Sequence, residues 1–517
     1  MTMNKDMIVT EMVGAIPIIS EYLNKISFIS NIDGLVRPLR SNHSRLTHGE
    51  TCFVMILYLL CRPHVMYRVE DWVANTTYLK ILFPQIQPGH LSDDRLADTL
   101  KALQEAGIRN LFSGQSVRII KEFNLSMKQV HCDFTNFTVH GDYNRHVENS
   151  ITITYGFSKS HRADKKQFAQ EVAVTDDGGV PVMTQSLSGN TADVTRYIPV
   201  WHEIQRCMGS SDFLTIGDCK LSSEENLLTI AKGNGYFAAP LAMYSTLKEQ
   251  LKKLVLEEEK PLELLREIQR EGTHITYHGF EIPATLVDSE TGEKYTYRKI
   301  FVKSSQLEVI HLKTLENRLQ KAQKEIEALQ TKLCTGKKND TKESILEALT
   351  SIYKRHDVTG LFDHNLEENI SLIKKQKGRG KPGPHTEYIV IQQKNYTLIF
   401  HQNIKAIDTT KKLCGYFVLA TNKTNRQMSM PCVLDAYKKE WKVEQIFERL
   451  KGPLQVVPIY LQRPDHIESM MYLLMTCAQI FTLMDREAKN TLKDNTEKLE
   501  GLFPNKIKVA NPKAEHF

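Results

Sequence analysis

The chain has 517 residues, of which 41% are hydrophobic and 25% are charged. This length is too great for one hydrophobic core, so two to four domains are expected. The composition is that of an ordinary soluble globular protein. The formal net charge of +6 permits a nucleic-acid partner but does not require one.

The spacing of the cysteines and the length of the apolar runs argue against zinc-binding, secreted and membrane-spanning proteins. The nine cysteines are scattered without a CxxC pair, which argues against structural zinc and suits a reducing cytosol. The first residues lack the basic start and apolar run of a signal peptide. The longest apolar stretches, residues 52–61 and 469–484, are shorter than the roughly 20 residues of a membrane span. We expect a cytoplasmic protein with no membrane partner.

Residues 1–125 are predicted to form an all-helical amino-terminal domain. Thr47-His48-Gly49-Glu50 is a capping box before an apolar helix that runs to Leu60. Ser92-Asp93-Asp94 begins a second helix, which Gly107 ends.

From residue 126 to residue 240 the periodicity changes to that of an α/β domain. Strands are predicted at residues 130–139, 151–155, 168–175, 180–186, 213–216 and 235–239, and helices at about 192–207 and 223–231. Antiparallel strands followed by alternating helices and strands are the order of an RNase H-like core, a mixed sheet with flanking helices.

Residues 241–385 have a different pattern of predicted helices and strands, and we expect them to form an insertion domain. A short helix precedes a β-meander at 273–287 and 294–302. A heptad stripe follows, formed by Leu312, Leu315, Leu319, Ala322, Ile326, Leu329 and Leu333. This stripe fits either a coiled coil or a long helix packed on a neighbour within the insertion. Residues 374–384 are rich in lysine and glycine and are predicted to be a flexible basic linker.

The α/β core is predicted to resume over residues 386–485. Strands are expected at 388–400 and 415–421, and helices at about 434–450 and 465–484. The remaining residues, 486–517, are polar and lysine-rich and are predicted to be a peripheral tail.

One predicted helix, residues 435–454, combines an apolar stripe with an unusual polar line. Val443, Ile446, Phe447, Leu450 and Leu454 form the stripe. Tyr437, Glu444 and Lys451 are seven residues apart and therefore lie nearly in line beside it. A carboxylate flanked by a phenol and an ammonium suits metal and phosphate. The alternative is that Glu444, Glu448 and Lys451 form ordinary surface pairs.

Two aspartates strengthen the metal interpretation. Asp133 lies within an apolar strand, where a charge is costly unless it is paired or bound to metal. Asp218 follows a buried strand at its carboxyl end, where α/β sheets place their ligands. Asp133 could instead pair with a buried basic residue, and Asp218 could cap a turn. Together with Glu444, they form a set of hard oxygen ligands suited to Mg²⁺.

The chain resembles the insertion-sequence transposases of the DDE superfamily that carry a Y-(2)-R-(3)-E-(6)-K signature. Tyr437, Glu444 and Lys451 occupy the tyrosine, glutamate and lysine positions of that signature. Further blocks of the family are matched by residues 155–162, 188–193 and 218–227, and its helical amino-terminal domain by residues 67–72 and 91–96. The resemblance covers nearly the whole chain, and the combination of blocks is more specific than any one of them.

One residue departs from the family pattern, and the spacing of the acidic residues fits a part of the family. Glu440 stands at the signature's arginine position, so the phosphate contact made there in relatives is in doubt, and Lys438, Lys439 or Lys442 are the substitutes at hand. The 226 positions between Asp218 and Glu444 (444 − 218) fit relatives with an inserted β-rich domain. In some of these an aromatic side chain of the insertion stabilises a flipped base. All three tryptophans, Trp72, Trp201 and Trp441, lie outside the predicted insertion.

The resemblance implies a metal-dependent DNA transposase. Asp133, Asp218 and Glu444 would hold two Mg²⁺ ions, with Mn²⁺ as a substitute, for cleavage at transposon ends and transfer of the freed 3′-hydroxyl to target DNA. Tyr437 and Lys451, with Lys438 and Lys442, would contact phosphates. The partners implied are terminal inverted repeats, target DNA and a second copy in a synaptic dimer, within the nucleoid of a prokaryote. The heptad stripe is a candidate surface for that dimer.

Two further segments are candidates for supporting roles. Arg379 and Lys381, between glycines in the basic segment, resemble an arm that enters the minor groove, although such runs are usually solvated linkers. His161 and Arg162 belong to a family block and are expected to support the site. His140, His161 and His385 lack the spacing of metal ligands.

Three other functions stay open at this point. A transposase-derived DNA-binding protein without activity would explain Glu440 but not the intact acidic triad. An RNase H-like nuclease would cleave without strand transfer. A coiled-coil assembly protein would leave Asp133 unexplained.

Overall fold

The computed structural model describes residues 13–38, 46–61, 66–159, 162–270, 272–334, 341–377, 379–380, 382–383, 386–456, 459, 461–495, 497–502 and 507–514. The chain divides into two compact units. Unit 1 comprises Met1–Leu241, Pro283–Arg298 and Ala420–Phe517, and unit 2 comprises Ala242–Ile282 and Lys299–Leu419. The protein is therefore a core with an insertion, as the sequence predicts, and each unit is described by itself.

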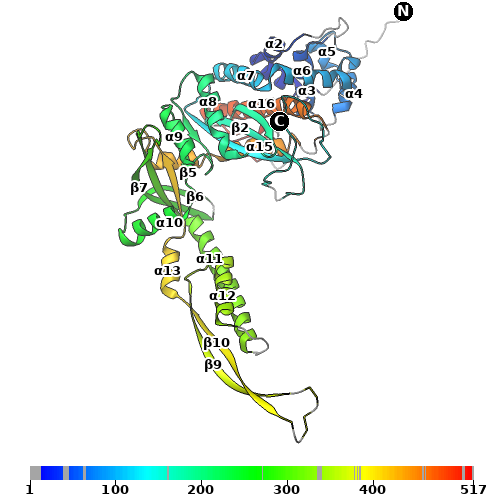
Figure 1. The fold of residues 1–517 in the computed structure, drawn as a ribbon. Coiled ribbons are helices and arrows are strands. Elements are labelled where there is room, and N and C mark those ends of the chain that lie inside the picture. Colours follow the sequence, from blue (N-terminus) through cyan, green and yellow to red (C-terminus); the bar gives the residue numbers. More distant parts are fainter. Residues whose placement is uncertain are drawn as a thin grey trace, which may run out of the picture. The chain divides into compact units, whose positions relative to one another are not determined.

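The amino-terminal part of unit 1 is helical (Figure 1), as predicted. Thr47 and Glu50 form the expected reciprocal cap, in which each side chain accepts a hydrogen bond from the other residue's backbone N–H (3.1 and 2.8 Å). Gly107 ends a helix with φ +89°, which glycine adopts without steric cost. The elements are α1 (Ile16–Lys25), α2 (Phe28–Asp33), α3 (His48–Cys61), η1 (Met66–Arg68), α4 (Val69–Ala74), α5 (Tyr78–Leu82), η2 (Pro88–Leu91), α6 (Asp93–Ala106) and α7 (Ile108–Glu122).

The sheet of unit 1 has an RNase H-like strand order. It is formed by β1 (Gln129–Thr138), β2 (Gln167–Thr175), β3 (Pro181–Ser188), β4 (Leu214–Ile216) and β5 (Tyr236–Pro240), in the order β3-β2-β1-β4-β5. β1 and β2 are antiparallel, as are β2 and β3, whereas β1, β4 and β5 are parallel. The strand expected at residues 151–155 is absent: Thr154 makes only an isolated bridge to Gln167.

Helices cover both faces of this sheet. On one face, Val130, Cys132 and Phe134 of β1 share a hydrophobic core with α8 (Tyr197–Met208) and α9 (Glu224–Lys232). On the other face, Phe137 of β1 and Phe168 of β2 share a core with α15 (Trp441–Lys451) and α16 (Pro464–Asp494). The remaining elements of this part are η3 (Asp193–Thr195) and α14 (Met430–Tyr437).

The amino-terminal helices and the sheet belong to one hydrophobic core, and the boundary predicted at residue 125 does not separate two compact units. α16 joins them: buried Gln115 of α7 donates hydrogen bonds to Thr476 and Gln479, and Ser469 donates to a carbonyl oxygen of α6. By length and composition α16 could cross a membrane, but 94% of its most apolar 18-residue stretch is buried inside the protein. It is the central helix of unit 1. It also extends beyond the predicted end at residue 484, and Ala514 of the expected peripheral tail is buried.

A buried ion pair fixes α15 to α16. Arg449 (2% exposed) donates to Asp485 (3% exposed) and to Thr482, while Asp485 also accepts from the backbone N–H of Ala514. Removing one partner leaves the other charge buried and unpaired. We therefore expect Arg449→Ala to lower the free energy of unfolding by about 3–5 kcal/mol, measured by urea denaturation. The double variant Arg449→Met/Asp485→Leu should recover most of this loss; if it does not, packing and not the charge pair is responsible.

Unit 2 contains a small sheet, two long helices and a β-ribbon. Its elements are α10 (Ser245–Lys252), the π-helix η4 (Lys253–Glu257), β6 (Glu263–Arg270), β7 (Thr273–Val287), β8 (Lys294–Ser304), α11 (Ser305–Cys334), α12 (Lys342–His356), β9 (Phe362–Gln376), β10 (Tyr388–Gln402), α13 (Ile404–Lys412) and β11 (Tyr416–Thr421). The small sheet has the order β11-β8-β7-β6; β7, β8 and β11 have their other ends in unit 1.

The heptad stripe is buried within unit 2. Leu315, Leu319, Ala322 and Ile326 of α11 pack against α12 and against Tyr396 and Leu398 of β10. Of the two interpretations, the long helix packed on its neighbour is therefore the one that the structure has. The same burial removes the stripe as a candidate dimer surface.

The basic segment lies between the two paired strands of a β-hairpin and begins within the first of them. β9 and β10 pair over their full length, from Phe362↔Gln402 to Gln376↔Tyr388. The prediction that the core resumes at residue 386 is consequently wrong, because β10 and α13 belong to unit 2, which extends to Leu419. Composition marked the glycines and lysines of the turn, but it could not reveal that the strands on either side pair with each other.

Candidate active site

Asp133 and Asp218 lie beside each other at one edge of the unit 1 sheet. β1 and β4 are parallel, and their last registered pair is His131 with Ile216. Asp133 is two residues beyond His131, and Asp218 is two residues beyond Ile216. Neighbouring strands are about 4.8 Å apart, so residues at equivalent positions are neighbours in space. The structure thus brings together two carboxylates that are 85 positions apart in sequence (218 − 133).

Asp133 projects from the face of β1 that carries α15. Alternation along a strand places Asp133 and Thr135 on the same face, and Thr135 accepts a hydrogen bond from Lys451 of α15 (2.7 Å). The Asp133 side chain is only 20% exposed. Burial raises the pKa of Asp133 to about 6; the ammonium of Lys159 opposes this shift, and the carboxylate of Asp218 adds to it. A carboxylate whose ionised form is disfavoured by burial in this way is suited to bind a cation.

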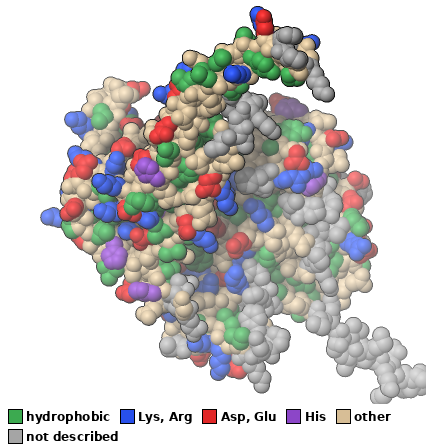
Figure 2. Space-filling model, turned by 90° about the horizontal axis from the view of Figure 1, so that it is seen from below, with side chains coloured by type: hydrophobic (Ala, Val, Ile, Leu, Met, Phe, Trp, Pro, Cys, Tyr) green, Lys and Arg blue, Asp and Glu red, His purple; other side chains and the backbone are tan. Residues whose placement is uncertain are grey.

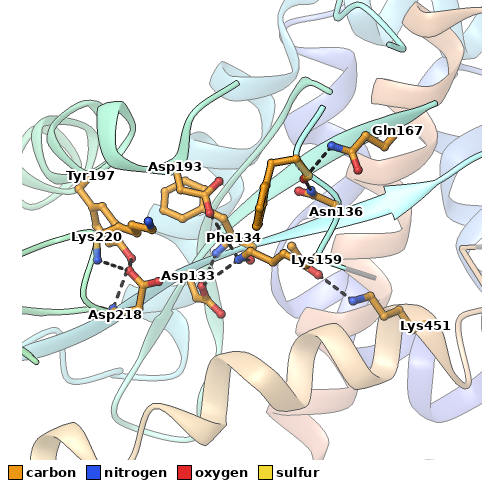
Figure 3. A network of polar contacts seen from close by, with 12 residues as sticks. Asp133, Phe134, Asn136, Lys159, Gln167, Asp193, Tyr197, Asp218, Lys220 and Lys451 are labelled. Atoms are coloured by element: carbon orange, nitrogen blue, oxygen red, sulfur yellow. Dashed lines mark hydrogen bonds and ion pairs between the residues drawn. The ribbon is translucent and has the colours of Figure 1, made fainter. Parts of the chain in front are cut away.

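An ammonium group lies between Asp133 and a second aspartate (Figure 3). Lys159 Nζ donates to the carbonyl oxygen of Phe134 and is 3.9 Å from Asp133 Oδ1 and 3.5 Å from Asp193 Oδ2. Of the alternatives left open for Asp133, pairing with a basic residue is thus partly realised. The pair is long and Lys159 is 40% exposed, so Asp133 is not neutralised as it would be in a closed ion pair.

Asp218 is positioned by the first turn of α8. The buried hydroxyl of Tyr197 donates to Asp218 Oδ1 (2.8 Å), and the backbone N–H of Lys220 donates to the same oxygen (2.8 Å). The alternative role of capping the following turn is therefore also present. Both hydrogen bonds end on Oδ1, so among the described residues the Oδ2 atom is left to accept from a further ligand.

Tyr197→Phe is expected to weaken metal binding without unfolding the protein. The ring keeps its packing against Phe134, while the bond that orients Asp218 is lost. Partners that orient a metal ligand are typically worth about 10–100-fold in metal affinity, and we expect a loss near the lower end. Titration with Mn²⁺ would measure it. Tyr295→Phe, which removes the hydrogen bond from Tyr295 to Glu293, is the matched control; an equal effect in both variants would contradict the positioning role.

The helix predicted over residues 435–454 is broken. α14 ends at Tyr437 and α15 begins at Trp441. Lys439 in the turn between them and Lys442 in the first turn of α15 both bind Asp176 of the β2–β3 turn (2.9 and 2.7 Å). Tyr437 is therefore not on one helical line with Glu444 and Lys451, as the periodicity predicted. It still belongs to the same neighbourhood, because Asp218 contributes to the raised pKa of Tyr437.

Glu440 lies close enough to Asp133, Asp218 and Glu444 for their charges to act on it. Burial raises the pKa of Glu440 to about 7, and the charges of Asp133, Asp218 and Glu444 add to the shift. Glu440 occupies the last position before α15, and Glu444 is exposed in its first turn. The residue that departs from the family signature is thus the glutamate that faces both aspartates, and Glu444 is its neighbour.

The residues present fit a divalent cation by their chemistry. Two aspartates on adjacent strands repel each other, a lysine ammonium already sits at their edge, and glutamates approach from α15. These are hard oxygen donors of the kind that Mg²⁺ prefers. In the described part of the chain, no three His, Cys, Asp or Glu side chains are close enough to hold one ion as they stand. The Glu444 side chain would have to approach the aspartates.

The other residues singled out by the sequence have varied surroundings. Lys451 lies near Asp133, whereas Lys442 is paired with Asp176 and is only 14% exposed. Lys438 is exposed. Arg162 is paired with Asp164 at the surface. His161 and Lys381 lie outside the described residues, and Arg379 is in the hairpin turn.

Sequence reasoning missed three residues of the site: Lys159, Asp193 and Tyr197. The first two lie inside blocks that resemble the family, so their positions were available as candidates. Nothing in the spacing indicated that the two blocks meet. They do so at Gly156 and Gly189, where a Cβ on Gly156 would lie 2.0 Å from the Gly189 carbonyl oxygen.

Comparison with known families agrees with the fold. A sheet of this order, with aspartates on two neighbouring parallel strands, has the architecture of RNase H-like proteins. A family model described as "Transposase DDE domain" matches residues 129–480, more than half of the chain, and the chain therefore belongs to that family of transposases. A second model, a domain of unknown function (DUF4277), matches residues 8–117.

Other comparisons add little. No curated protein matches the chain. Among solved structures, one described as a cryo-EM structure of the piggyBac transposase synaptic complex with hairpin DNA matches with 9% identity and a TM-score of 0.38, covering 93% of this chain and 75% of that one. A likeness at this level carries no structural argument.

Proposed function

We propose that this transposase cuts DNA at the ends of a mobile element and joins the freed 3′-hydroxyl to target DNA. Asp133, Asp218 and Glu444 would bind the divalent ions, two Mg²⁺ per site with Mn²⁺ as a substitute. When bound, such ions stabilise the attacking and leaving oxygens of an in-line displacement at a phosphodiester. The observation that carries the proposal is the register of β1 and β4: its last pair, His131 with Ile216, puts Asp133 and Asp218 each two residues further along neighbouring parallel segments.

The protein's own groups would hold the phosphodiester in place. Lys451 lies near Lys159 and near Asp133, since the charges of these two residues both affect the pKa of Lys451, which burial lowers. Tyr437 presents a hydroxyl on the same side, near Asp218. Two ammonium groups and a phenol around the carboxylates supply charge and donors for phosphate oxygens. Lys438, exposed before α15, extends this surface.

The hairpin β9/β10 supplies a second DNA-contact surface. Residues 374–387 contain five basic residues and one acidic residue, including Arg379 and Lys381. The same ribbon also carries apolar side chains that face solvent: Ile370, Leu372, Ile373, Ile389, Val390 and Ile391 are 39–68% exposed. Figure 2 shows hydrophobic and basic side chains along the projecting ribbon. A basic two-stranded ribbon fits a DNA groove.

A cleavage and joining assay tests the proposal. Full-length protein and Mg²⁺ are incubated with DNA that carries the inverted repeats flanking the gene, and cut and joined products are separated on a gel. We expect cutting and joining with wild type and neither with Asp218→Asn. Cutting without joining would identify a nuclease, and binding alone an inactive DNA-binding relic. Sedimentation of the DNA complex would test the proposed synaptic dimer, and imaging in a prokaryotic host would test location in the cytoplasm at the nucleoid.

A further inference from the structure

We propose that Lys159 is the internal counter-cation of the acidic site: its ammonium holds the place of a divalent ion beside Asp133 in the metal-free protein, and Asp193 retains the ammonium when Asp133 turns to a metal. Lys159 is thereby a positioning residue that sets how tightly the free protein binds metal. This inference rests on the proposed function. It concerns two residues to which neither the family resemblance nor the comparisons give a role.

The ammonium is fixed by backbone and shared by carboxylates. Its hydrogen bond goes to the Phe134 carbonyl oxygen, whereas Asp133 and Asp193 are 3.9 and 3.5 Å away. Charge-assisted hydrogen bonds are normally about 2.7–2.9 Å long. Neither carboxylate is therefore closed off, and the ammonium can leave Asp133 without losing its carbonyl acceptor or Asp193.

The segment that presents Lys159 is firmly attached to the sheet. The carbonyl oxygen of Phe157 accepts hydrogen bonds from Asn136 of β1 (2.7 Å) and Gln167 of β2 (3.1 Å). Gly156 and Gly189 pack so closely that a side chain on Gly156 would collide with a backbone oxygen. An ammonium delivered by an anchored loop, and not by a surface chain free to sample solvent, is a built part of the site.

Electrostatics give the direction of the effect. The Lys159 ammonium lies 3.9 Å from Asp133 Oδ1 and 3.5 Å from Asp193 Oδ2, so its positive charge repels any second cation at the same place. Neutralising Lys159 should therefore tighten metal binding, whereas a purely structural lysine would weaken it or leave it unchanged.

Mn²⁺ titration of the DNA-free, full-length protein at pH 8.5, followed by the electron paramagnetic resonance of free Mn²⁺, tests this. We expect Lys159→Met and Lys159→Gln to lower the Kd about 5–10-fold and Lys159→Arg to stay within about twofold. Asp193→Asn should raise the Kd, because the ammonium then has only Asp133. Adding Lys159→Met to Asp193→Asn should abolish that rise. Lys165→Met, on the same segment, is the control and should have no effect.

The outcomes separate this inference from the proposed function. If both neutral variants fold, as judged by thermal unfolding, and bind Mn²⁺ no more tightly than wild type, the counter-cation role is wrong while the metal site stands. If wild type binds Mn²⁺ no better than Asp133→Asn or Asp218→Asn does, the metal site itself is wrong, and the inference fails with it. Tighter binding in Lys159→Met together with weaker binding in Asp193→Asn supports the inference.

Discussion

Asp133→Asn should abolish end cleavage and, in the same variant, make the metal-free protein more stable. The amide cannot provide the anionic oxygen that a divalent ion requires, and we expect the cleavage rate to fall by about three orders of magnitude or more, equivalent to about 4 kcal/mol of transition-state stabilisation. Stability should change in the opposite direction, because the carboxylate is ionised at a place that disfavours its charge.

The pH dependence of this gain follows from the pKa shift. Burial raises the pKa of Asp133 in the folded state to about 6, from 3.8. Between these two values the folded protein holds a proton that the unfolded chain releases, so this group's contribution to stability declines as pH rises through that window and stays low above pH 6. Asn does not titrate. The variant should therefore gain little at pH 4 and on the order of 1–2 kcal/mol at pH 8, given partial exposure and the loss of attraction to Lys159.

The thermal unfolding of Asp133→Asn and of wild type should be compared at each pH in the presence of EDTA. The difference matters because other groups titrate as well: burial lowers the pKa of His131, and this group makes wild type more stable as pH rises toward 6.5. Thermal unfolding should show a difference that is small at pH 4 and a few degrees at pH 8. Asp142→Asn, at an exposed carboxylate after β1, is the control. A destabilised Asp133→Asn at pH 8 would mean that Lys159 pairs with Asp133 far more strongly than the 3.9 Å separation indicates.

The two aspartates could be found from the sequence because each leaves a local signal. Asp133 interrupts an apolar strand and Asp218 directly follows one. Burial patterns of period two and carboxyl ends of strands are properties of short segments, and the RNase H-like order follows from the succession of such segments. The core strands were predictable for this reason, even though strand pairing itself is a long-range property.

Features that depend on long-range contacts escaped prediction. The break between α14 and α15 is held by Asp176, which is 263 residues before Lys439 (439 − 176). An apolar stripe that continues through residues 443–454 gives no sign of it. The hairpin, likewise, requires two strands to find each other across a turn whose composition alone is that of a linker. Lys159, which lies near both Asp133 and Asp193, is in a loop, and Asp193 begins a three-residue 3-10 helix; neither segment is long enough or regular enough to carry a periodicity.

Glu444→Gln and Glu440→Gln should have unequal effects, although the two residues are one helical turn apart. Glu444 is the signature glutamate, and we expect its loss to reduce cleavage about 10³-fold, as for Asp133. Glu440 stands where the family signature has an arginine, and we expect Glu440→Gln to retain cleavage within about tenfold at pH 8. Gel assays of end cleavage measure both. Glu448→Gln, an exposed glutamate one turn further along α15, is the control.

The expected effect of Glu440→Gln is on the pH profile. Glu440 and Asp133 repel each other when both are ionised, and this repulsion contributes to a Glu440 pKa of about 7. Removing the Glu440 charge lowers the pKa of Asp133, since a negative neighbour disfavours ionisation. Asp133 then becomes ionised at lower pH, so the acid limb of the cleavage profile should move to lower pH in Glu440→Gln. The limb of Glu448→Gln should coincide with that of wild type.

The reverse result would assign the third metal-binding carboxylate to Glu440. Glu440 is half-buried and the charges of both aspartates act on it, whereas Glu444 is exposed, so Glu440 is the alternative candidate for the third ligand. If Glu440→Gln abolishes cleavage and Glu444→Gln retains it, the residue at the arginine position has become the metal ligand. Loss of Mn²⁺ affinity in Glu440→Gln alone would lead to the same conclusion without any DNA substrate. Equal losses in both variants would mean that α15 contributes two carboxylates, and that the departure at residue 440 adds a ligand to the site.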